Sequence, residues 1–449
     1  MHVIVIGGGI GGLALAQGLR KAGVSVAVYE RDSGPASRWE GYRIHIDPAG
    51  ARSLRACLPE NLWQAFLATC GPGGDFGFVT EGLRELVVVE ESIAYPAVSD
   101  PAEGHYAADR PTLRRLLRAG LGDVVRFGAE FTRYEHTADG RVAAVFADGS
   151  RAVGDVLVGA DGASSRVRRQ RLPQARSVSA GAVGMAHKIW LTEEITGLVP
   201  ERLLTGMNIV MVDQRCFMFT SVFTPPPGAA EALAEADGGP EPASLKRPYL
   251  LCALVAHPDV LPQGVTELTG DALARVVDTL IADWSPDLRR LLARADPESL
   301  GAISFNASEP VPAWASGNVT VLGDAVHTMP PIGGLGGNTA LRDARLLTRM
   351  LTAAHRGERE LVPAIAAYEE QMREYGYAAV RSALAEKDQV LANTGAFGQI
   401  MLRTWFRICA KVGPLRRRTF RQGFAHSAPR AWETETPGSR ENEPVTTGV

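Results

Sequence analysis

Residues 2–30 read HVIVIGGGIGGLALAQGLRKAGVSVAVYE, and this stretch decides the fold of the first part of the chain. It opens with a short run of β-branched residues, which is typical of a strand buried in a parallel sheet. A glycine cluster follows, and then a segment of helix formers that ends at Gly23, a favourable residue for closing a helix. A second apolar run completes the stretch. Strand, glycine turn, helix and strand in this order predict a βαβ unit.

The glycine cluster has the spacing G-x-G-x-x-G. Glycine lets the backbone turn tightly and approach a pyrophosphate, and the following helix offers unpaired N–H groups and the positive end of its dipole. Glu30 ends the second strand, where it can accept hydrogen bonds from ribose hydroxyls and would repel a 2′-phosphate. We therefore expect a site for FAD or NAD rather than a glycine-rich turn that binds nothing. The residues expected at this site are Gly7, Gly9, Ile10, Gly11, Gly12, Glu30 and Arg31.

The composition is that of an ordinary globular protein, with 45% hydrophobic and 22% charged residues. A formal net charge of −3 over 449 residues does not suggest a nucleic-acid partner. The five cysteines contain no CxxC and the nine histidines do not cluster, so we expect neither disulfides nor a metal site. We find no signal-peptide pattern and no apolar run of about 18 residues. These features predict a cytoplasmic protein without a transmembrane segment and leave its oligomeric state open.

Residues 323–338 read GDAVHTMPPIGGLGGN and form a second glycine cluster, directly before a helical pattern. The acid at the end of the preceding apolar run can accept a hydrogen bond from a ribityl hydroxyl of FAD, and the glycines let the backbone lie against a flat ring system. Asn338 is a good N-cap for the next helix, whose positive end would then point at the flavin. The first cluster would hold the AMP end and the second the flavin end, unless the second is only a surface loop rich in turn residues. The residues expected to contact the cofactor here are Asp324, Pro331, Gly334, Gly336, Gly337 and Asn338.

Between the two clusters the pattern changes to longer strands, from residue 183 to residue 256, which indicates an antiparallel sheet. Residues 224–244 interrupt these strands and read as an exposed loop. We therefore expect an α/β protein, with a Rossmann-like FAD-binding domain interleaved with an antiparallel-sheet substrate domain. The expected division is an FAD-binding domain (1–78, 99–178 and 301–353), a substrate-binding sheet domain (79–98 and 179–300), C-terminal helices (354–425) and a disordered tail (426–449).

A third motif joins the two glycine clusters: LVGADGASSRVRR places Asp161 and Gly162 after a strand, directly before a helix. In order and spacing, the three motifs resemble the class A flavoprotein monooxygenases, the p-hydroxybenzoate hydroxylase-like group. The resemblance covers roughly residues 1–380. It implies tightly bound, non-covalent FAD in the site described above.

The same resemblance implies roles for further residues. Arg110 matches the arginine that contacts the flavin side in this family, and Asp161 matches the Asp-Gly motif that bridges FAD and a transient NAD(P)H site. Arg43 lies in the segment beside the isoalloxazine, where the family often has small residues. It could shield the ring, bind a nicotinamide phosphate, contact the substrate or simply be a solvated surface charge.

The substrate should lie between the antiparallel sheet and the flavin. We identify no catalytic triad, because the cofactor performs the chemistry. Arg43 and His187 are the candidates for a direct catalytic role. Other candidates for orienting the substrate are Lys188, Asp213, Arg215 and Tyr249, although each could equally be an outward-facing sheet residue.

The resemblance implies an FAD-dependent monooxygenase that uses NAD(P)H and O₂, through a flavin C4a-hydroperoxide, to hydroxylate or epoxidise a bulky, hydrophobic, aromatic or polycyclic compound. The segment GYRIHIDPAG and the short C-terminus are similar to bacterial members from secondary metabolism, including antibiotic biosynthesis. A redox-silent FAD protein that catalyses cyclisation or isomerisation is the alternative, and a flavin oxidase is a third possibility. The sequence does not distinguish NADH from NADPH.

One segment lies outside this interpretation. Residues 389–432 contain no acid and eight Lys or Arg residues, and part of the segment has amphipathic spacing. This pattern predicts either a helix packed on the two domains with a solvated basic face, or a patch for an anionic partner or a membrane surface.

Overall fold

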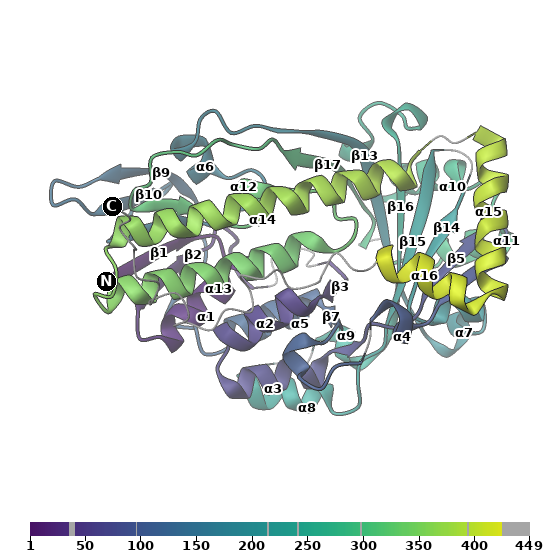
Figure 1. Ribbon diagram of the computed structural model, residues 1–449, viewed down its shortest axis with the longest axis horizontal. Helices are drawn as coiled ribbons and strands as arrows, with labels where there is room; N and C mark the ends of the chain where they lie inside the picture. The colour runs from purple at the N-terminus through teal and green to yellow at the C-terminus, as the bar shows by residue number, and fades with distance from the viewer. Residues whose placement is uncertain are drawn as a thin grey trace, which may run out of the picture.

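The computed structural model describes residues 1–423 apart from 36–40, 96, 213–214, 240–241, 297–298 and 393–394. The expected tail (426–449) and the candidate Asp213 lie outside the described residues. The elements form an elongated molecule, with a parallel sheet toward one end and an antiparallel sheet toward the other (Figure 1).

The parallel sheet has five strands in the order β18-β12-β1-β2-β8, and every neighbouring pair is parallel. The strands are β1 (His2–Ile6), β2 (Ser25–Tyr29), β8 (Val125–Arg126), β12 (Val156–Gly159) and β18 (Val319–Val321). In register, Ile6 pairs with both Tyr29 and Gly159, and Gly159 pairs with Val321. The carboxyl ends of four strands therefore meet at one edge of the sheet, as the βαβ pattern predicted for β1 and β2.

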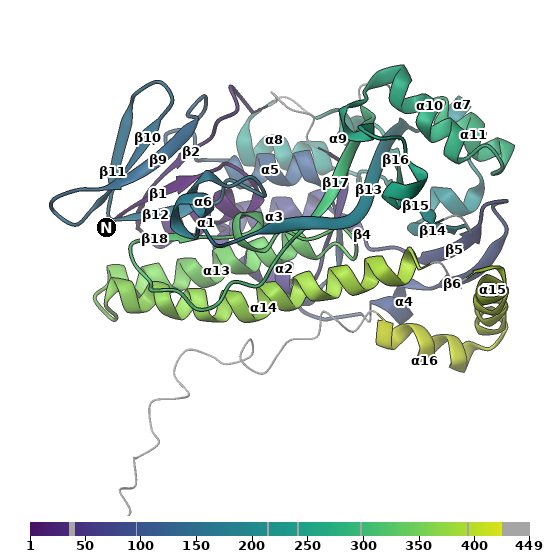
Figure 2. The ribbon, with the colours of Figure 1, turned by 90° about the horizontal axis from the view of Figure 1, so that it is seen from above.

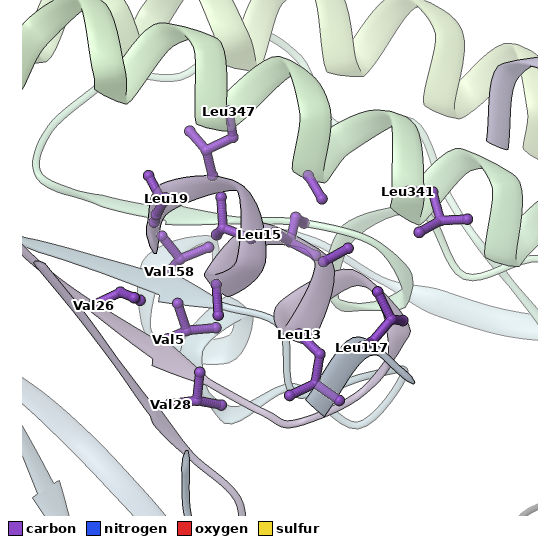
Figure 3. Packing of buried hydrophobic residues seen from close by; sticks show 14 of the residues in the cluster. Val5, Leu13, Leu15, Leu19, Val26, Val28, Leu117, Val158, Leu341 and Leu347 are labelled. Atoms are coloured by element: carbon purple, nitrogen blue, oxygen red, sulfur yellow. The ribbon is translucent and has the colours of Figure 1, made fainter. Parts of the chain in front are cut away.

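Three long helices cover this sheet. They are α1 (Ile10–Lys21), α13 (Leu335–His355) and α14 (Leu361–Val390). Leu15 and Leu19 of α1 lie between the valines of the sheet and Leu347 of α13 (Figure 3), and all of these side chains are buried. Gly18 allows the two helices to approach closely, because a Cβ at this position would lie 2.5 Å from Oγ1 of Thr348.

The second large sheet has seven strands in the order β17-β13-β16-β15-β14-β5-β6, antiparallel except for the pair β14–β5. The strands are β5 (Phe76–Thr80), β6 (Glu85–Val89), β13 (Ser177–Trp190), β14 (Met207–Met211), β15 (Cys216–Phe223), β16 (Tyr249–Ala256) and β17 (Gly301–Ser308). β17 pairs with β13, so residues 301–308 belong to this sheet, whereas the sequence division placed them with the FAD-binding domain.

One face of the seven-stranded sheet packs against the helices α10 (Gly270–Leu280) and α11 (Pro286–Leu292) in a separate apolar cluster. The opposite face carries Phe217, Phe219 and Val255, which pack with residues of α14 and of the second glycine cluster. This opposite face therefore lies toward residues 323–338, which we call the cofactor loop after their expected role.

Two three-stranded sheets complete the fold. One, in the order β11-β10-β9, projects at one end of the molecule (Figure 2) and consists of β9 (Phe131–His136), β10 (Val142–Phe146) and β11 (Arg151–Gly154). The other, in the order β3-β7-β4, consists of β3 (Arg43–Ile46), β4 (Gly71–Pro72) and β7 (Tyr106–Asp109).

The remaining helices include one that the sequence analysis missed. Residues 224–244 were expected to form an exposed loop, but they contain α8 (Ala229–Asp237), which buries Ala229 and Leu233. Glycines in the left-handed conformation bound it at both ends, Gly228 and Gly238. The other short helices are α2 (Pro48–Cys57), α3 (Glu60–Thr69), α4 (Glu91–Ala94), α5 (Arg110–Arg118), α6 (Arg166–Arg171), α7 (Glu193–Thr196), α9 (Ala243–Lys246) and α12 (Asp324–His327), with 3₁₀ turns at Pro101–Glu103, Glu201–Leu204, Pro258–Val260 and Val265–Glu267.

The described chain ends with α15 (Gly395–Lys411) and α16 (Gly413–Gly423), which pack beside β5 and β6 (Figures 1 and 2). Among the helices of the described residues, none combines the length and the hydrophobicity that crossing a bilayer requires.

Candidate functional site

Four residues expected at the cofactor follow neighbouring strands of the parallel sheet. Gly7 follows β1, Glu30 follows β2, Asp161 follows β12 and Asp324 follows β18. Because the strand ends are in register, the structure brings the three sequence motifs to one edge of the sheet. Ligands of open α/β sheets bind at this edge.

The glycines of the first cluster have two different roles. A Cβ on Gly12 would overlap the carbonyl oxygen of Gly7, and a Cβ on Gly7 would overlap that of Ala160, so these glycines permit contact between the turn and the sheet. A Cβ on Gly9 would meet nothing within 4 Å. Gly9 is the N-cap of α1, so open space lies directly at the N-terminus of this helix.

Glu30 supports the same turn. Its Oε2 accepts a hydrogen bond from the Gly8 N–H at 2.7 Å, and its Oε1 accepts one from the Asp32 N–H at 3.0 Å. Arg31 beside it is exposed. Arg114 of α5, which the sequence analysis missed, donates from Nη2 to the Gly8 carbonyl at 3.3 Å. Its spacing of four residues from Arg110 on one helix face was the available signal.

The helices α1 and α13 run side by side in the same direction. A Cβ on Gly11 would lie 3.3 Å from the Cβ of Ala340, and Gly18 lies opposite Thr348 farther along both helices. Because α13 begins five residues before Ala340 and α1 begins one residue before Gly11, the N-terminus of α13 extends about 6 Å beyond that of α1. The positive ends of both helix dipoles therefore point in the same direction, and that of α13 lies farther along it.

The second glycine cluster starts α13 in an unexpected way. Asn338 was predicted as the N-cap, but Gly334 has this position, with φ of 68°, and Asn338 is buried inside the first turn. Its Oδ1 accepts a hydrogen bond from the Asp47 N–H, and its Nδ2 donates to the carbonyl oxygens of His45 and Gly334. Asn338 therefore joins β3 to the loop. A Cβ on Gly337, next to it, would meet nothing within 4 Å.

Asp324 is the first residue of α12, near the start of the second glycine cluster. Its side chain is exposed, yet the protein around it reduces solvation enough to raise the pKa of the carboxyl group. The positive charges of His327 and Arg110 oppose this effect. A carboxylate that is accessible and at the same time poorly solvated faces an enclosed space, which suits hydrogen bonding to a hydroxyl group of a ligand.

A buried hydrogen-bond network centred on Asp343 holds the start of the second glycine cluster in place. Asp343 of α13 accepts hydrogen bonds from the Gly323 N–H at 2.7 Å and from the Tyr375 hydroxyl at 2.6 Å, and it pairs with Nε2 of His327 at 2.7 Å. Burial lowers the pKa of His327, but the charge and hydrogen bond of the Asp343 carboxylate, together with the charge of Asp324, raise it overall. His327 thus has a supporting position.

Comparison with known proteins gives a consistent result. Family models match an FAD binding domain at residues 284–383 and an NAD(P)-binding Rossmann-like domain at residues 5–68. A crystal structure from Photorhabdus luminescens, described as an FAD-containing monooxygenase, superposes with a TM-score of 0.75 at 35% identity, covering 88% of this chain and 100% of that one. The chain belongs to the FAD-dependent monooxygenases.

Two curated relatives of this family are similar over most of the chain. A dual O-methyltransferase/FAD-dependent monooxygenase of Phaeosphaeria nodorum is 31% identical over 380 residues, which is 79% of this chain and 40% of the relative. The chain thus spans about two fifths of the length of that relative. An FAD-dependent urate hydroxylase of Klebsiella pneumoniae is 28% identical over 381 residues, covering 83% of this chain and 85% of the relative.

The residues present fit FAD, the cofactor of this family. Gly9 and Gly337 lie at the N-termini of two parallel helices. A Cβ at either residue would project into open space, which the glycines leave free for a ligand. Asp324 presents an accessible carboxylate close to Gly336, whose Cβ would lie 3.8 Å from Oδ1 of Asp324. Gly334 approaches β3 closely, because its Cβ would lie 3.4 Å from the Cβ of His45, and Pro331 is exposed.

The hydrogen bonds of the Asp161 carboxylate hold the turn and helix that follow β12. Its Oδ2 accepts hydrogen bonds from the backbone N–H groups of Arg166 and Val167, at 2.7 and 3.3 Å, at the start of α6. Its Oδ1 accepts one from the Ser165 hydroxyl. Asp161 thus orders the turn after β12.

Arg43 is not a surface charge, so the interpretation as a solvated residue was wrong. Its side chain is buried and donates from Nη2 to the Gly73 carbonyl at 2.7 Å, while its Nε has no hydrogen-bond partner within the described residues. Burial lowers the pKa of Arg43. The alternatives that place it near the ring or the substrate stay open.

Beside Arg43 lies an aromatic cluster that the sequence analysis missed. The rings of His45, Tyr95 and His105 pack with centroids 4.2 to 5.2 Å apart, and Nε2 of His45 lies 3.1 Å from Nδ1 of His105. Burial, together with the charge of Arg43, lowers the pKa of His45 well below its usual value, and burial lowers the pKa of His105 to about 4. The cluster is thus neutral near pH 7. Its residues come from separate segments, so no local pattern could reveal it.

The candidates on the seven-stranded sheet separate onto two faces. His187 shares the helix-covered face with Val183, Met185 and Ile189 and pairs across the ladder with Cys252, so the structure places it away from the cofactor loop. Burial lowers its pKa to about 4. Arg215 is at the other end of the sheet, in an ion pair with Asp259 at 2.7 Å.

Lys188 and Tyr249 lie on the face toward the cofactor loop. The Tyr249 hydroxyl donates to Oδ1 of Asp109 at 2.9 Å, and Asp109 also accepts from the Ser244 hydroxyl. Lys188 Nζ lies 4.4 Å from the centroid of the Tyr249 ring. Asp109 also caps α5 through the Thr112 N–H, so this network connects the sheet to the helix that carries Arg110.

Proposed function

We propose that the chain uses NAD(P)H and O₂ to insert one oxygen atom into a bulky aromatic or polycyclic compound, by hydroxylation or epoxidation. The observation that carries this proposal is the parallel pair α1 and α13, with open backbone at Gly9 and at Gly337. This arrangement suits an extended dinucleotide, with its pyrophosphate at α1 and its ring system at α13, as the three-motif resemblance implies.

The protein would contribute position and electrostatics. When bound, FAD supplies the redox chemistry between NAD(P)H, O₂ and the substrate. The N-terminus of α13 would stabilise the negative charge of the reduced ring, because its backbone N–H groups and dipole face that side. The neutral cluster at His45 and His105, with the buried cation Arg43, would form a wall of the same space.

Apolar surface supports a hydrophobic substrate. Ile209 and Phe219 of the seven-stranded sheet and Ile332 and Leu335 of the second glycine cluster are partly buried and pack in one cluster. Such side chains exclude water from the space between the sheet and the loop, which oxygen transfer from a reactive flavin requires. We propose this space as the substrate site and retain the division into FAD-binding, substrate-binding and C-terminal helical regions, with β17 in the substrate-binding part.

An isotope experiment tests the proposal. The FAD-loaded protein is supplied with NADH or NADPH, ¹⁸O₂ and a panel of naphthols, anthrones and urate, the last because a relative at 28% identity is a urate hydroxylase. Incorporation of one ¹⁸O atom into an aromatic product supports the proposal, and labelling of urate alone would reject the bulky substrate. Peroxide formation without label would indicate an oxidase. Product formation without NAD(P)H would indicate a redox-silent protein.

A further inference from the structure

The helix α15 carries an exposed apolar stripe along its outer face. Phe397, Ile400 and Met401 expose 77%, 62% and 58% of their surfaces. The spacing follows successive helical turns, so these side chains form one continuous surface. We define the α15 stripe as Phe397, Ile400, Met401, Trp405 and Ile408 of α15, with Val412 directly after the helix.

The inner face of α15 is packed, so the stripe is not the result of an undocked helix. Phe406 and Cys409 are buried in a cluster with Val87 and Val89 of β6. Arg403 forms an ion pair with Glu81 at 2.8 Å. Arg416 of α16 forms a second with Glu90 at 2.6 Å, which fixes the adjoining helix on the same side. The helix is thus held to the sheet edge, and its opposite face points outward (Figures 1 and 2).

The charges that α15 and α16 themselves carry have one sign. Arg407 and Lys411 are exposed on α15, and Arg417 and Arg418 are exposed on α16. Residues 389–432 contain eight Lys or Arg and no Asp or Glu, although the whole chain has a net charge of −3. A local positive field thus borders an apolar surface that includes Trp405 and Phe397.

We propose that the α15 stripe seats the protein on an anionic lipid surface. Aromatic and aliphatic side chains on one face of a helix, flanked by Lys and Arg, insert at the boundary between headgroups and acyl chains while the cations meet lipid phosphates. α15 has 17 residues and lies flat against the sheet edge, an orientation suited to lying in the interface. A second copy is a poorer occupant, because two-fold pairing of this face would bring Arg407 and Lys411 close to their own copies.

The inference is independent of the proposed reaction and is tested on the full chain loaded with FAD. Flotation with vesicles of phosphatidylcholine and phosphatidylglycerol is compared with flotation on phosphatidylcholine alone. We expect binding to the mixed vesicles, weaker binding without the anionic lipid, and a further decrease as salt is raised. Brominated lipid should quench Trp fluorescence, and a Trp405→Phe variant should lose this quenching.

A matched pair of variants locates the surface. Ile400→Glu combined with Ile408→Glu should weaken vesicle binding at least about tenfold, because two apolar side chains that would insert into the lipid become charged. Ile303→Glu is the control: Ile303 is 57% exposed on β17, at the opposite edge of the same sheet, and its substitution should leave binding unchanged. Unchanged flavin absorbance and thermal unfolding show that both variants fold.

Three results would overturn the inference. They are no flotation with either vesicle, equal flotation of the double variant and the unaltered chain, and a dimer in sedimentation velocity that the double variant converts to a monomer. The last result would assign the stripe to a second copy.

Discussion

Replacement of Gly337 by alanine separates the stability of the protein from its affinity for FAD. Gly337 is the third residue of α13, its φ is not in the left-handed region, and an added Cβ would meet nothing within 4 Å. Alanine therefore fits the apoprotein without strain. The added methyl group would instead occupy the space in which we place the flavin ring.

The two effects have opposite signs. Alanine is favoured over glycine in a helix by about 1 kcal/mol, and in the first turn we expect about half of this as increased stability of the apoprotein. In the complex, the methyl group would hold a flat ring away from the backbone N–H groups of α13. The loss of contact and of part of the helix dipole should weaken FAD binding about tenfold, which is about 1.4 kcal/mol.

The measurements are chemical denaturation of the FAD-free protein and titration of that protein with FAD, followed by flavin fluorescence. Gly413→Ala is the control, because Gly413 also begins a helix, has no left-handed φ and faces open space, but lies in α16 beside β6. It should increase stability similarly and leave FAD affinity unchanged. Because FAD stabilises the folded state by mass action, Gly337→Ala should lower the melting temperature when FAD is present well above both dissociation constants, while it raises that of the apoprotein.

Unchanged FAD affinity in Gly337→Ala, with increased apoprotein stability, would show that no ring system approaches the N-terminus of α13. Decreased apoprotein stability would show instead that the space at this residue is occupied by the protein itself.

Two other substitutions test the supports of the site. Asn338→Ala removes the three hydrogen bonds to Asp47, His45 and Gly334, so urea denaturation should show a loss of about 3 kcal/mol, and an unchanged stability would contradict the bridging role. Burial lowers the pKa of His187 from 6.5 to about 4, so the folded state resists protonation and stability should decrease as the pH falls from 6.5 toward 4. His187→Leu should therefore gain about 2 kcal/mol relative to the unaltered chain between pH 7.5 and pH 5, measured by denaturation at each pH, whereas a constant difference would refute the assignment.

The parts of the fold that local patterns determine were predictable. β1, α1 and β2 follow from β-branched runs and glycine spacing within residues 2–30, and the structure confirms the Rossmann-like α/β class. The helix α8 was missed although AAEALAEAD contains strong helix formers, because the surrounding prolines and glycines favoured a loop. The glycines at both of its ends are helix boundaries in the structure.

The candidate site was predictable where a motif has a physical reason and not where side chains converge from distant segments. Gly9 precedes α1 and Asp324 follows β18, as the patterns around them predicted, and their contacts with FAD stay predictions. Asn338 was misassigned because the left-handed Gly334 lets α13 begin four residues earlier. The partners of His45 come from other parts of the chain, and only the folded structure brings them together.

The order of strands in the parallel sheet has a consequence for synthesis on the ribosome. β18 is an edge strand made more than three hundred residues after β1, and α13, which covers the Gly11 and Gly18 side of α1, is made later still. The nascent N-terminal half thus exposes apolar surface that stays uncovered until residue 355 has emerged. In the proposed arrangement, FAD is therefore captured late in the synthesis of each molecule, and chains that stop before this point lack the α13 end of the site.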